Sequence, residues 1–345
     1  MSHSSHFLSV LNGQSSPIPP IWMMRQAGRH LPEYLELRAR AKDFMDFCYS
    51  PSLACEATLQ PIRRYDMDAA ILFADILLVL DGMGFSVHFE KGIGPIVTGY
   101  QAEKTLPLLN LEKALQTVSP VFETAQRVRE HLPKTKALIG FCGSPWTVGL
   151  YAIEGRGGTD KSEIRKLAYQ APERLTDLLD QIIEVSAHYL ARQAEVGANA
   201  LMLFESWAEG LPNDLFEKFV STPNRKLIQR VRDLGSDVPI IAFPRGAGSN
   251  LPHFLEHVQP QGVGLDTAVN PDYIKSVVPK SITVQGHLDP LLLIAGGDAL
   301  DQRVDALLEA YSDRPYIFNL GHGVRPETPI AHVEQVVKRI RASRV

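Results

Sequence analysis

Short apolar runs recur along the chain and are separated by longer amphipathic stretches. Eight of these runs are too short for a stable helix, rich in Ile, Val, Leu or Phe, and without regular polar alternation. That pattern is typical of strands buried on both faces of a sheet. The predicted strands are residues 21–24, 69–73, 137–141, 200–204, 239–243, 262–265, 282–285 and 316–320.

The stretches between the runs predict helices over residues 51–64, 111–131, 172–196, 214–234, 299–311 and 329–342. Ser50 and Pro51 suit the start of the first of these, and Gly197 suits the end of the third. Eight buried strands alternating with helices predict an α/β fold, and eight is the number that closes a single-domain (β/α)8 TIM barrel. A doubly wound sheet is disfavoured because no glycine fingerprint follows the first strand.

Polar side chains follow almost every predicted strand. In a parallel barrel the carboxyl ends of all strands lie on one face, where the active sites of barrel enzymes are found. Segments far apart in sequence are therefore expected to line one pocket. These segments are 25–29, Asp75, 142–146, 205–207, 245–248, Asp266, 286–289 and 321–323.

The length of 345 residues and the 45% apolar content suit one barrel domain over residues 1–345, with residues 1–15 as a flexible N-terminal arm. The net charge of −4 gives no reason to expect nucleic acid or an anionic membrane as a partner. An anionic ligand would have to be held by local positive charge, which directs attention to clustered arginines.

Cysteine usage and hydropathy indicate the compartment. The chain has three cysteines and no CxxC pair, which is typical of a reducing environment. The N-terminus shows no secretory signal, and the longest apolar stretch, residues 69–80, is interrupted by Asp75 and too short to span a bilayer. We expect a soluble, cytoplasmic protein.

Arginines cluster after the first predicted strand, where Arg25 and Arg29 flank a Gln-Ala-Gly segment and Arg38 follows. Guanidinium groups bind carboxylates in a bidentate manner and stay charged at physiological pH. The backbone N–H groups of Gln26 and Ala27 add potential donors for an oxygen ligand. The segment predicts a carboxylate-binding site, and a solvated basic loop is the plainer alternative.

The string Met-Arg-Gln-Ala-Gly-Arg at 24–29, followed by Leu-Pro-Glu at 31–33, resembles the N-terminal signature of the uroporphyrinogen decarboxylase family. The resemblance continues in order and spacing over most of the chain. It includes Ile-Leu-Phe-Ala-Asp-Ile at 71–76, Gly-Ser-Pro-Trp-Thr at 143–147, Tyr-Ala-Ile-Glu-Gly at 151–155, Leu-Phe-Glu-Ser at 203–206, Gly-Leu-Asp at 264–266, Gln-Gly-His-Leu-Asp-Pro at 285–290 and Asn-Leu-Gly-His-Gly at 319–323.

This resemblance implies a reaction and a substrate. Uroporphyrinogen III carries four acetate and four propionate groups, and the family converts each acetate to a methyl group with loss of CO2, giving coproporphyrinogen III in haem synthesis. The family uses no metal and no organic cofactor, and it is generally homodimeric. Protonation of a pyrrole α-carbon creates a cation that accepts the electrons released with CO2, so the substrate ring does the work of a cofactor.

The resemblance also implies residue roles. Asp75 would face the pyrrole N–H groups and stabilise the cation, although an aspartate at a strand end can also simply cap the next helix. The expected catalytic residues are Asp75, Arg25, Arg29 and Tyr151. Arg25, Arg29 and Arg38 would bind carboxylates, one of the first two could also relay or donate a proton, and the proton donor is left open. The remaining expected substrate contacts are Gln26, Ala27, Tyr151, Phe204, Ser206 and His322, with His287 behind them and the loop 155–158 as a possible cover.

Two other functions compete with this one. A zinc-dependent methyltransferase of the same barrel superfamily, acting on a corrinoid or thiol, would need thiolate and imidazole ligands, but the chain has no His-x-Cys pair. A non-catalytic tetrapyrrole-binding barrel would keep the arginines and lose Asp75 or Tyr151. Because both residues are present, the sequence favours the decarboxylase.

Overall fold

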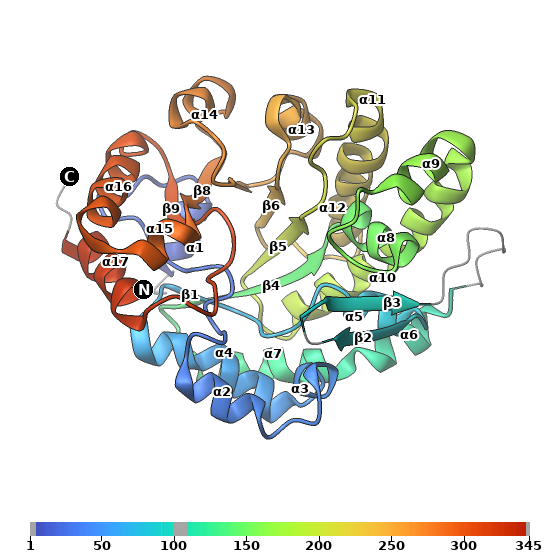
Figure 1. Ribbon diagram of the computed structural model, residues 1–345, viewed down its shortest axis with the longest axis horizontal. Coiled ribbons are helices and arrows are strands. Elements are labelled where there is room, and N and C mark those ends of the chain that lie inside the picture. Colours follow the sequence, from blue (N-terminus) through green and yellow to red (C-terminus); the bar gives the residue numbers. More distant parts are fainter. Residues whose placement is uncertain (1–4, 91, 99–108, 343–345) are drawn as a thin grey trace.

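The computed structural model describes residues 5–90, 92–98 and 109–342. Its central feature is a parallel sheet of seven strands that follow one another in space in the same order as in the sequence (Figure 1). The strands are β1 Ala69–Ile71, β4 Ala137–Gly143, β5 Ala200–Glu205, β6 Ile240–Pro244, β7 Gly262–Gly264, β8 Thr283–Leu288 and β9 Tyr316–Leu320. Almost every strand residue is buried, as the continuous apolar runs predicted.

The expected first strand, residues 21–24, is reduced to a single parallel bridge between Ile21 and Phe318 of β9. The Phe318 N–H donates to the Pro20 carbonyl at 2.9 Å, and the Asp68 N–H donates to the Ile21 carbonyl at 2.8 Å. The segment thus connects the last strand to the residue before β1. Pairing goes no further because side chains take the next two N–H groups: Gln26 accepts from Met23 and Asn319 accepts from Met24.

Helices surround the sheet, so the predicted α/β barrel class is confirmed. They are α1 His6–Leu11, α2 Pro32–Arg38, α3 Phe44–Cys48, α4 Pro51–Tyr65, α5 Leu78–Gly82, α6 Leu111–Thr117, α7 Ser119–His131, α8 Pro145–Glu154, α9 Ser162–Gln170, α10 Pro172–Glu195, α11 Asn213–Phe216, the π-helix η1 Glu217–Ser221, α12 Thr222–Asp233, the 3₁₀-helix η2 Gly248–Asn250, α13 Leu251–Val258, α14 Pro271–Val277, α15 Pro290–Ala295, α16 Gly297–Ala310 and α17 Ile330–Ala342.

Two predicted helices differ in detail. Residues 111–131 form two helices that meet at Val118, where Pro120 in the first turn of α7 cannot supply an N–H to continue α6. Residues 213–233 form one helical run, α11–η1–α12, with a π-helical segment before Pro223. Ser50 does occupy the N-cap position of α4, but its hydroxyl donates to the Asp46 carbonyl instead of capping that helix.

The N-terminal residues were expected to form a flexible arm, but residues 6–11 form helix α1 instead. Phe7, Val10 and Leu11 are buried in the core cluster of the barrel. The Thr283 hydroxyl at the start of β8 donates to the carbonyls of Val10 and Leu11 at 2.9 and 3.2 Å. The helix therefore packs against the amino-terminal side of the strands, and the sequence pattern missed it because only six residues are involved.

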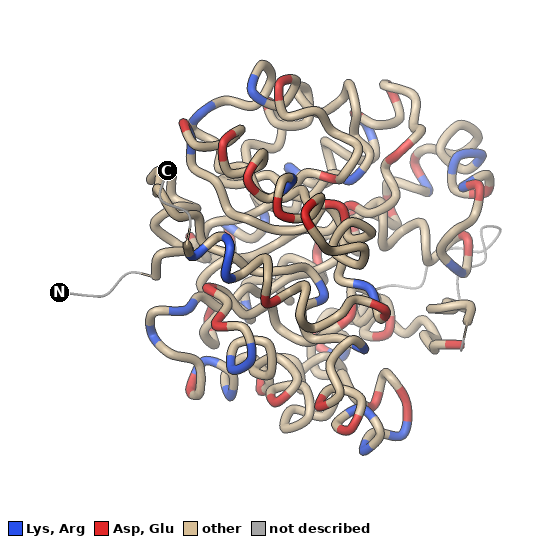
Figure 2. Tube along the Cα trace, turned by 60° about the vertical axis from the view of Figure 1, so that its left-hand side comes forward, with Lys and Arg blue, Asp and Glu red and all other residues tan. Residues whose placement is uncertain are grey.

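An antiparallel hairpin, β2 Ser86–Glu90 and β3 Gly94–Thr98, lies outside the barrel sheet and was also not predicted. Charged residues of both signs are interspersed over the surface in Figure 2, in agreement with the small net charge. Among the described residues, no helix has the length and apolar character needed to cross a membrane.

Candidate active site

The arginine segment lies between the barrel-closing residues and α2, and Gln26 holds it in place. The Gln26 side chain is buried, accepts from the Met23 N–H at 3.0 Å and donates to the Ala69 carbonyl of β1 at 3.0 Å. Its backbone N–H donates to the Met23 carbonyl. Gln26 was expected to contact substrate, but both its side chain and its N–H are occupied within the protein, so it fixes the loop on the barrel.

Arg25 has an unusual backbone, with φ of +59° in the left-handed region. Its side chain runs along Gly323, because a Cβ added to Gly323 would lie only 2.3 Å from the Arg25 Cδ. The Val324 N–H donates to the Met24 carbonyl at 2.8 Å and joins the same two loops. The loop after β9 therefore needs a glycine at 323 so that Arg25 can reach over the barrel mouth.

A cavity of about 560 Å³ lies beside this contact. It collects residues from the predicted polar segments after several strands, and Arg25, Arg29 and His322 are among them. The others are Glu209, Arg245, Gly246, Asp266, Thr267, Ala268, Asp289, Pro290, Leu291, Gly321, Gly323, Val324, Arg325 and Pro326. Segments distant in sequence thus meet at one mouth, as parallel barrel topology requires.

Among the described residues, most acidic groups around this cavity have partners within the protein, whereas two of its arginines have no acid partner. The acids are largely occupied: Glu209 pairs with Lys161 at 2.9 Å, and Asp266 accepts from the backbone N–H groups of Gly246 and Ala268. By contrast, no ion pair joins Arg25 or Arg29 to an acid in the described part of the chain. Two exposed guanidinium groups are therefore available to an anionic ligand.

Asp75 follows β1 and is half-buried. Burial raises the pKa of its carboxyl, while the Leu77 N–H, which donates to Oδ1 at 2.9 Å, and the charge of Arg25 act in the opposite direction. The N–H contact is the helix-start interaction that the plainer interpretation anticipated. The negative charge of Asp75 also raises the pKa of the Tyr151 hydroxyl on α8.

Tyr151 lies on α8 with its ring 6.4 Å from that of Trp207, and it is buried. Burial raises the pKa of the Tyr151 hydroxyl, a hydrogen bond to Trp207 lowers it, and Asp75 and Arg25 are the charges that act on it. A Cβ added to Gly157 would lie only 2.6 Å from the Tyr151 hydroxyl oxygen, so a larger residue at 157 would displace the tyrosine.

Phe204 lies in β5 and Ser206 follows that strand; neither lines the cavity at the mouth. Phe204 is buried edge-on against Phe141 at 5.5 Å between ring centroids, so it forms part of the barrel wall. The Ser206 N–H donates to the Thr147 hydroxyl at 2.8 Å, and its carbonyl accepts from Arg245 at 2.9 Å. The backbone of Ser206 is thus fixed from both sides.

Arg38, Ala27 and the loop after α8 do not line the cavity at the mouth. The Arg38 guanidinium sits 5.8 Å from the centre of the Phe47 ring and donates to the Ala41 carbonyl at 3.3 Å. Ala27 is half-buried beside the core. The loop expected to cover the pocket pairs with β3 at Arg156.

The two histidines differ in position. His322 lines the cavity, and burial together with Arg25, Arg245 and Arg325 lowers its pKa to about 4. It is therefore neutral at pH 7 and can both donate and accept a hydrogen bond. His287 is buried in β8 with Nε2 2.8 Å from the Tyr311 hydroxyl, and burial likewise lowers its pKa to about 4.

Two residues belong to the polar segments predicted to line the pocket, but the sequence assigned neither of them a role. Arg245 lines the cavity and bonds the Ser206 carbonyl, and Glu205 is buried at the end of β5, where it accepts from the Thr147 hydroxyl. Burial raises the pKa of Glu205 to about 8, against the hydrogen bond from Thr147. Their positions directly after β6 and at the end of β5 were the available signal.

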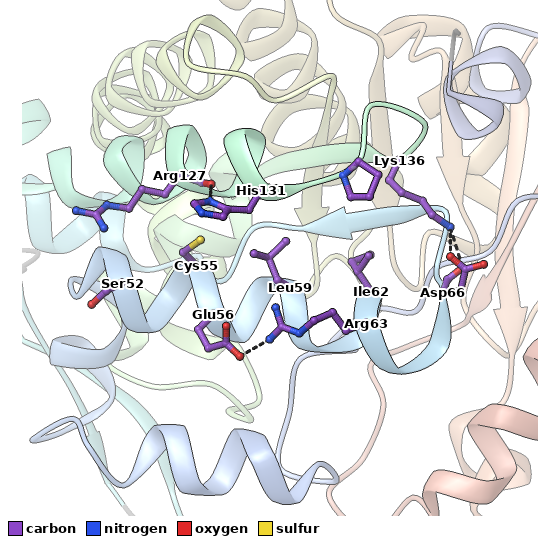
Figure 3. Close-up of a pocket in the computed structure, with 11 residues that line it drawn as sticks. Ser52, Cys55, Glu56, Leu59, Ile62, Arg63, Asp66, Arg127, His131 and Lys136 are labelled. Atoms are coloured by element: carbon purple, nitrogen blue, oxygen red, sulfur yellow. Dashed lines mark hydrogen bonds and ion pairs between the residues drawn. The ribbon is translucent and has the colours of Figure 1, made fainter.

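A second cavity, of about 600 Å³, lies on the outside of the barrel between α4 and α7 (Figure 3). Its cations are already paired: Arg63 with Glu56 and Lys136 with Asp66. None of the predicted site residues lines it. The cavity at the barrel mouth is therefore the better candidate for an anionic substrate.

Together, a parallel α/β barrel and polar residues gathered at the carboxyl ends of its strands define the architecture of a barrel enzyme. Residues 2–343 match the family model described as "Uroporphyrinogen decarboxylase (URO-D)". The chain belongs to the uroporphyrinogen decarboxylase family.

Individual relatives agree over the full length. A protein of Hyphomonas neptunium named uroporphyrinogen decarboxylase is 60% identical over 334 residues, 97% of each chain. One of Caulobacter vibrioides with the same name is 48% identical over 345 residues, covering 100% of this chain and 97% of the other. A solved methyltransferase from Methanosarcina mazei has a TM-score of 0.82 at 18% identity, with 99% and 98% coverage, and is similar in fold alone.

Proposed function

We propose that this protein is a uroporphyrinogen decarboxylase that removes CO2 from the four acetate groups of uroporphyrinogen III and forms coproporphyrinogen III. Family membership over nearly the whole chain supports the activity. The observation that supports the site assignment is the cavity at the barrel mouth, which is lined by Arg25, Arg29 and His322. Asp75 does not line this cavity, but the charge of Arg25 acts on the pKa of its carboxyl.

The reaction needs a proton donor, a group that stabilises a cation, and groups that bind the substrate carboxylates. A proton added to a pyrrole α-carbon makes the ring cationic, the bond between CH2 and CO2 breaks, and its electrons return to the ring. The methylene carbon then takes up a proton and the α-carbon loses one, leaving a methyl group. Asp75 would stabilise the cation as a fixed negative charge, which is most effective where water is excluded.

Arg25, Arg29 and Arg38 would bind substrate carboxylates, although Arg38 does not line the cavity. Because arginine is a poor acid at neutral pH, we assign these residues to binding. Neutral His322 and the Tyr151 hydroxyl would supply uncharged hydrogen bonds to the reacting acetate, Ser206 would supply another, and Phe204 the apolar wall. Gln26 would act by holding the loop, and Ala27 by offering a backbone N–H.

The decisive experiment is an anaerobic incubation of the purified protein with uroporphyrinogen III. We expect released CO2 and products with seven, six, five and finally four carboxylates on chromatography. Tight binding of the porphyrinogen without CO2 release would identify a binding barrel instead. Methyl transfer from a methylated corrinoid to a thiol, without decarboxylation, would identify the methyltransferase.

We further propose that the protein is a cytoplasmic homodimer. All three cysteines are unpaired and buried, which suits a reducing compartment. Ile93 and Leu291 are among the large apolar side chains that remain exposed in the single chain, and Leu291 also lines the cavity. Sedimentation velocity at micromolar concentration would reveal a dimer, and a monomer there would contradict the proposal.

A further inference from the structure

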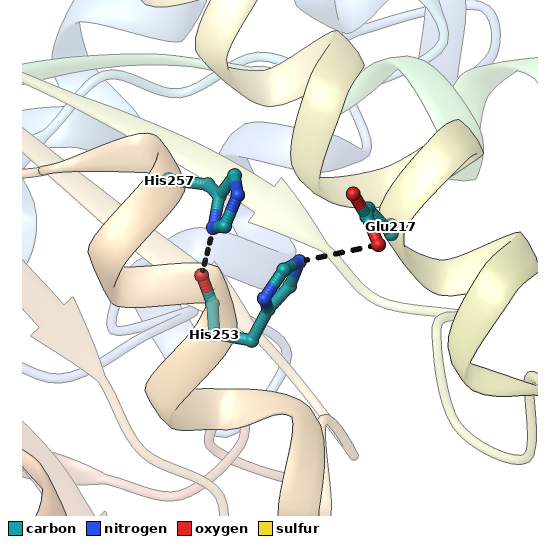
Figure 4. A group of neighbouring side chains, drawn as sticks. All are labelled: Glu217, His253 and His257. Atoms are coloured by element: carbon teal, nitrogen blue, oxygen red, sulfur yellow. Dashed lines mark hydrogen bonds and ion pairs between the residues drawn. The ribbon is translucent and has the colours of Figure 1, made fainter.

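Two histidines and a glutamate meet on the outer helices, away from the residues that line the barrel mouth (Figure 4). His253 and His257 are four residues apart on α13 and so lie on one face of the helix. Glu217 opens η1. One ring nitrogen of each histidine and one Glu217 oxygen all lie within 4.8 Å of one another.

The hydrogen-bond pattern leaves ligand atoms available. His257 Nδ1 lies 2.9 Å from the His253 carbonyl, which can only accept, so Nδ1 carries the hydrogen and Nε2 keeps its lone pair. His253 Nε2 is 3.7 Å from a Glu217 oxygen, which is too far for a hydrogen bond. That nitrogen is buried and has no other partner. A backbone carbonyl fixing the tautomer is the usual support of a metal-binding imidazole.

The position of Glu217 follows from the sequence of its helix. Pro223 lacks an N–H and its ring would collide with the carbonyl four residues earlier, and the helix adopts the π form just before it. Single-turn π segments recur at functional sites. In the described part of the chain, Glu217 forms an ion pair with His253 alone, so no lysine or arginine neutralises it.

We propose that Glu217, His253 and His257 bind a divalent transition-metal ion, with Zn²⁺ the natural probe. Two imidazoles and a carboxylate leave a fourth tetrahedral position for water. Zinc bonds of about 2.0–2.1 Å place donor atoms roughly 3.4 Å apart. The three donor atoms lie within 4.8 Å of one another, so they would have to approach by at most about 1.4 Å to bind the ion. Glu217 is exposed. The ion would link α13 to η1.

This site differs from the zinc centre of the rival methyltransferase, which would use a cysteine ligand. Cys48, Cys55 and Cys142 are all buried and none belongs to the group. Bound zinc by itself would therefore not argue for methyl transfer.

The test is zinc titration of the tag-free full-length protein after treatment with a chelator, followed by calorimetry. We expect one Zn²⁺ per chain with micromolar or tighter affinity, and a rise in Tm because the ion binds only the folded state. His253→Ala, His257→Ala and Glu217→Gln should each weaken binding by about tenfold or more. The control is His88→Ala, since His88 faces Glu90 at 3.3 Å on the hairpin with no second histidine in that group.

Circular dichroism and Tm without metal would establish that each variant is folded. Unchanged zinc affinity in folded His253→Ala and His257→Ala would overturn the proposal, as would only millimolar binding by the unaltered protein. If the variants fail to fold, Co²⁺ added to the unaltered protein decides: intense visible bands of tetrahedral Co²⁺ support the site, and the weak spectrum of octahedral Co²⁺ overturns it.

Discussion

Asp75 combines two opposing influences, because burial raises the pKa of its carboxyl while Arg25 and the Leu77 N–H favour the anion. If its charge stabilises a ring cation, Asp75→Asn should keep the Leu77 contact yet lower kcat by about 10²–10³, the usual effect of losing one preorganised electrostatic group. Steady-state decarboxylation measures this. A variant with kcat within threefold of the unaltered enzyme would remove Asp75 from the mechanism.

Arg29 is exposed and without an acid partner in the described residues. Its interactions with substrate carboxylates would act on ground state and transition state alike. Arg29→Ala should therefore raise KM with little change in kcat, and lower kcat/KM by about 10–100-fold, the equivalent of roughly 1.5–3 kcal/mol for charged hydrogen bonds. The same change at exposed Arg40 is the control and should leave KM unaltered. A fall in kcat alone would contradict the binding role.

Glu205 predicts a pH effect on stability. Burial raises the pKa of its carboxyl from the usual 4.5 to about 8 in the folded protein, so the folded state holds the proton more tightly. The stability it contributes is complete below about pH 4.5 and is lost as pH rises towards about 8. As pH rises over that window, the free energy of unfolding of the unaltered protein should fall by on the order of 3–5 kcal/mol relative to that of Glu205→Gln.

Urea unfolding of both proteins at pH 5.5 and pH 8.5 gives this difference, because other groups titrate equally in the two. Glu309→Gln removes an exposed carboxyl and should show no pH-dependent difference from the parent. An equal free-energy gap between Glu205→Gln and the parent at both pH values would mean that Glu205 is ionised in the folded protein throughout.

The residues whose neighbours come from the same motif were predictable, and those with distant partners were not. Arg25 stands directly after the predicted strand 21–24 and lines the cavity at the mouth. Asp75 follows the predicted strand 69–73 after one residue, and burial raises the pKa of its carboxyl while the charge of Arg25 acts to lower it. The hydrogen bonds of the Gln26 side chain to Met23 and Ala69 were not predictable from the sequence, because Ala69 lies 43 residues away. A side chain's hydrogen-bond partner depends on the assembled barrel, whereas its place after a strand does not.

At the scale of elements, the buried strands were easy to locate because both of their faces are apolar. Helix α1 and the β2–β3 hairpin are too short to show a recognisable hydrophobic period, so the sequence did not predict them. Phe7 is fully buried under the barrel. Phe7→Ala should lower the free energy of unfolding by about 3–5 kcal/mol, by loss of burial and creation of a cavity. Urea denaturation measures the change.

Leu35 provides the comparison, since it is 50% exposed on α2. Leu35→Ala should change the free energy of unfolding by no more than about 0.5 kcal/mol. If Phe7→Ala is equally mild, α1 is a flexible arm in solution, as the sequence suggested.

For the whole molecule, strand order was predictable because consecutive βα units place each new strand beside the last. How the ring closes was not, because residues 20–22 use only a few backbone hydrogen bonds to connect β9 with the start of β1. The Trp22 indole N–H adds a bond across the interior to the Gln285 side chain at 2.8 Å, joining residues 263 apart. Closure thus rests partly on one buried polar contact.

Trp22→Phe tests this contact by removing the donor while keeping most of the apolar volume. The Gln285 carbonyl oxygen would then be buried without its partner, so the free energy of unfolding should fall by about 1–3 kcal/mol beyond the loss of ring size. Adding Gln285→Met removes the stranded oxygen and should recover part of that cost, giving a coupling above about 0.5 kcal/mol in the double-mutant cycle. Strictly additive effects would mean that the barrel closes through its backbone hydrogen bonds and packing alone.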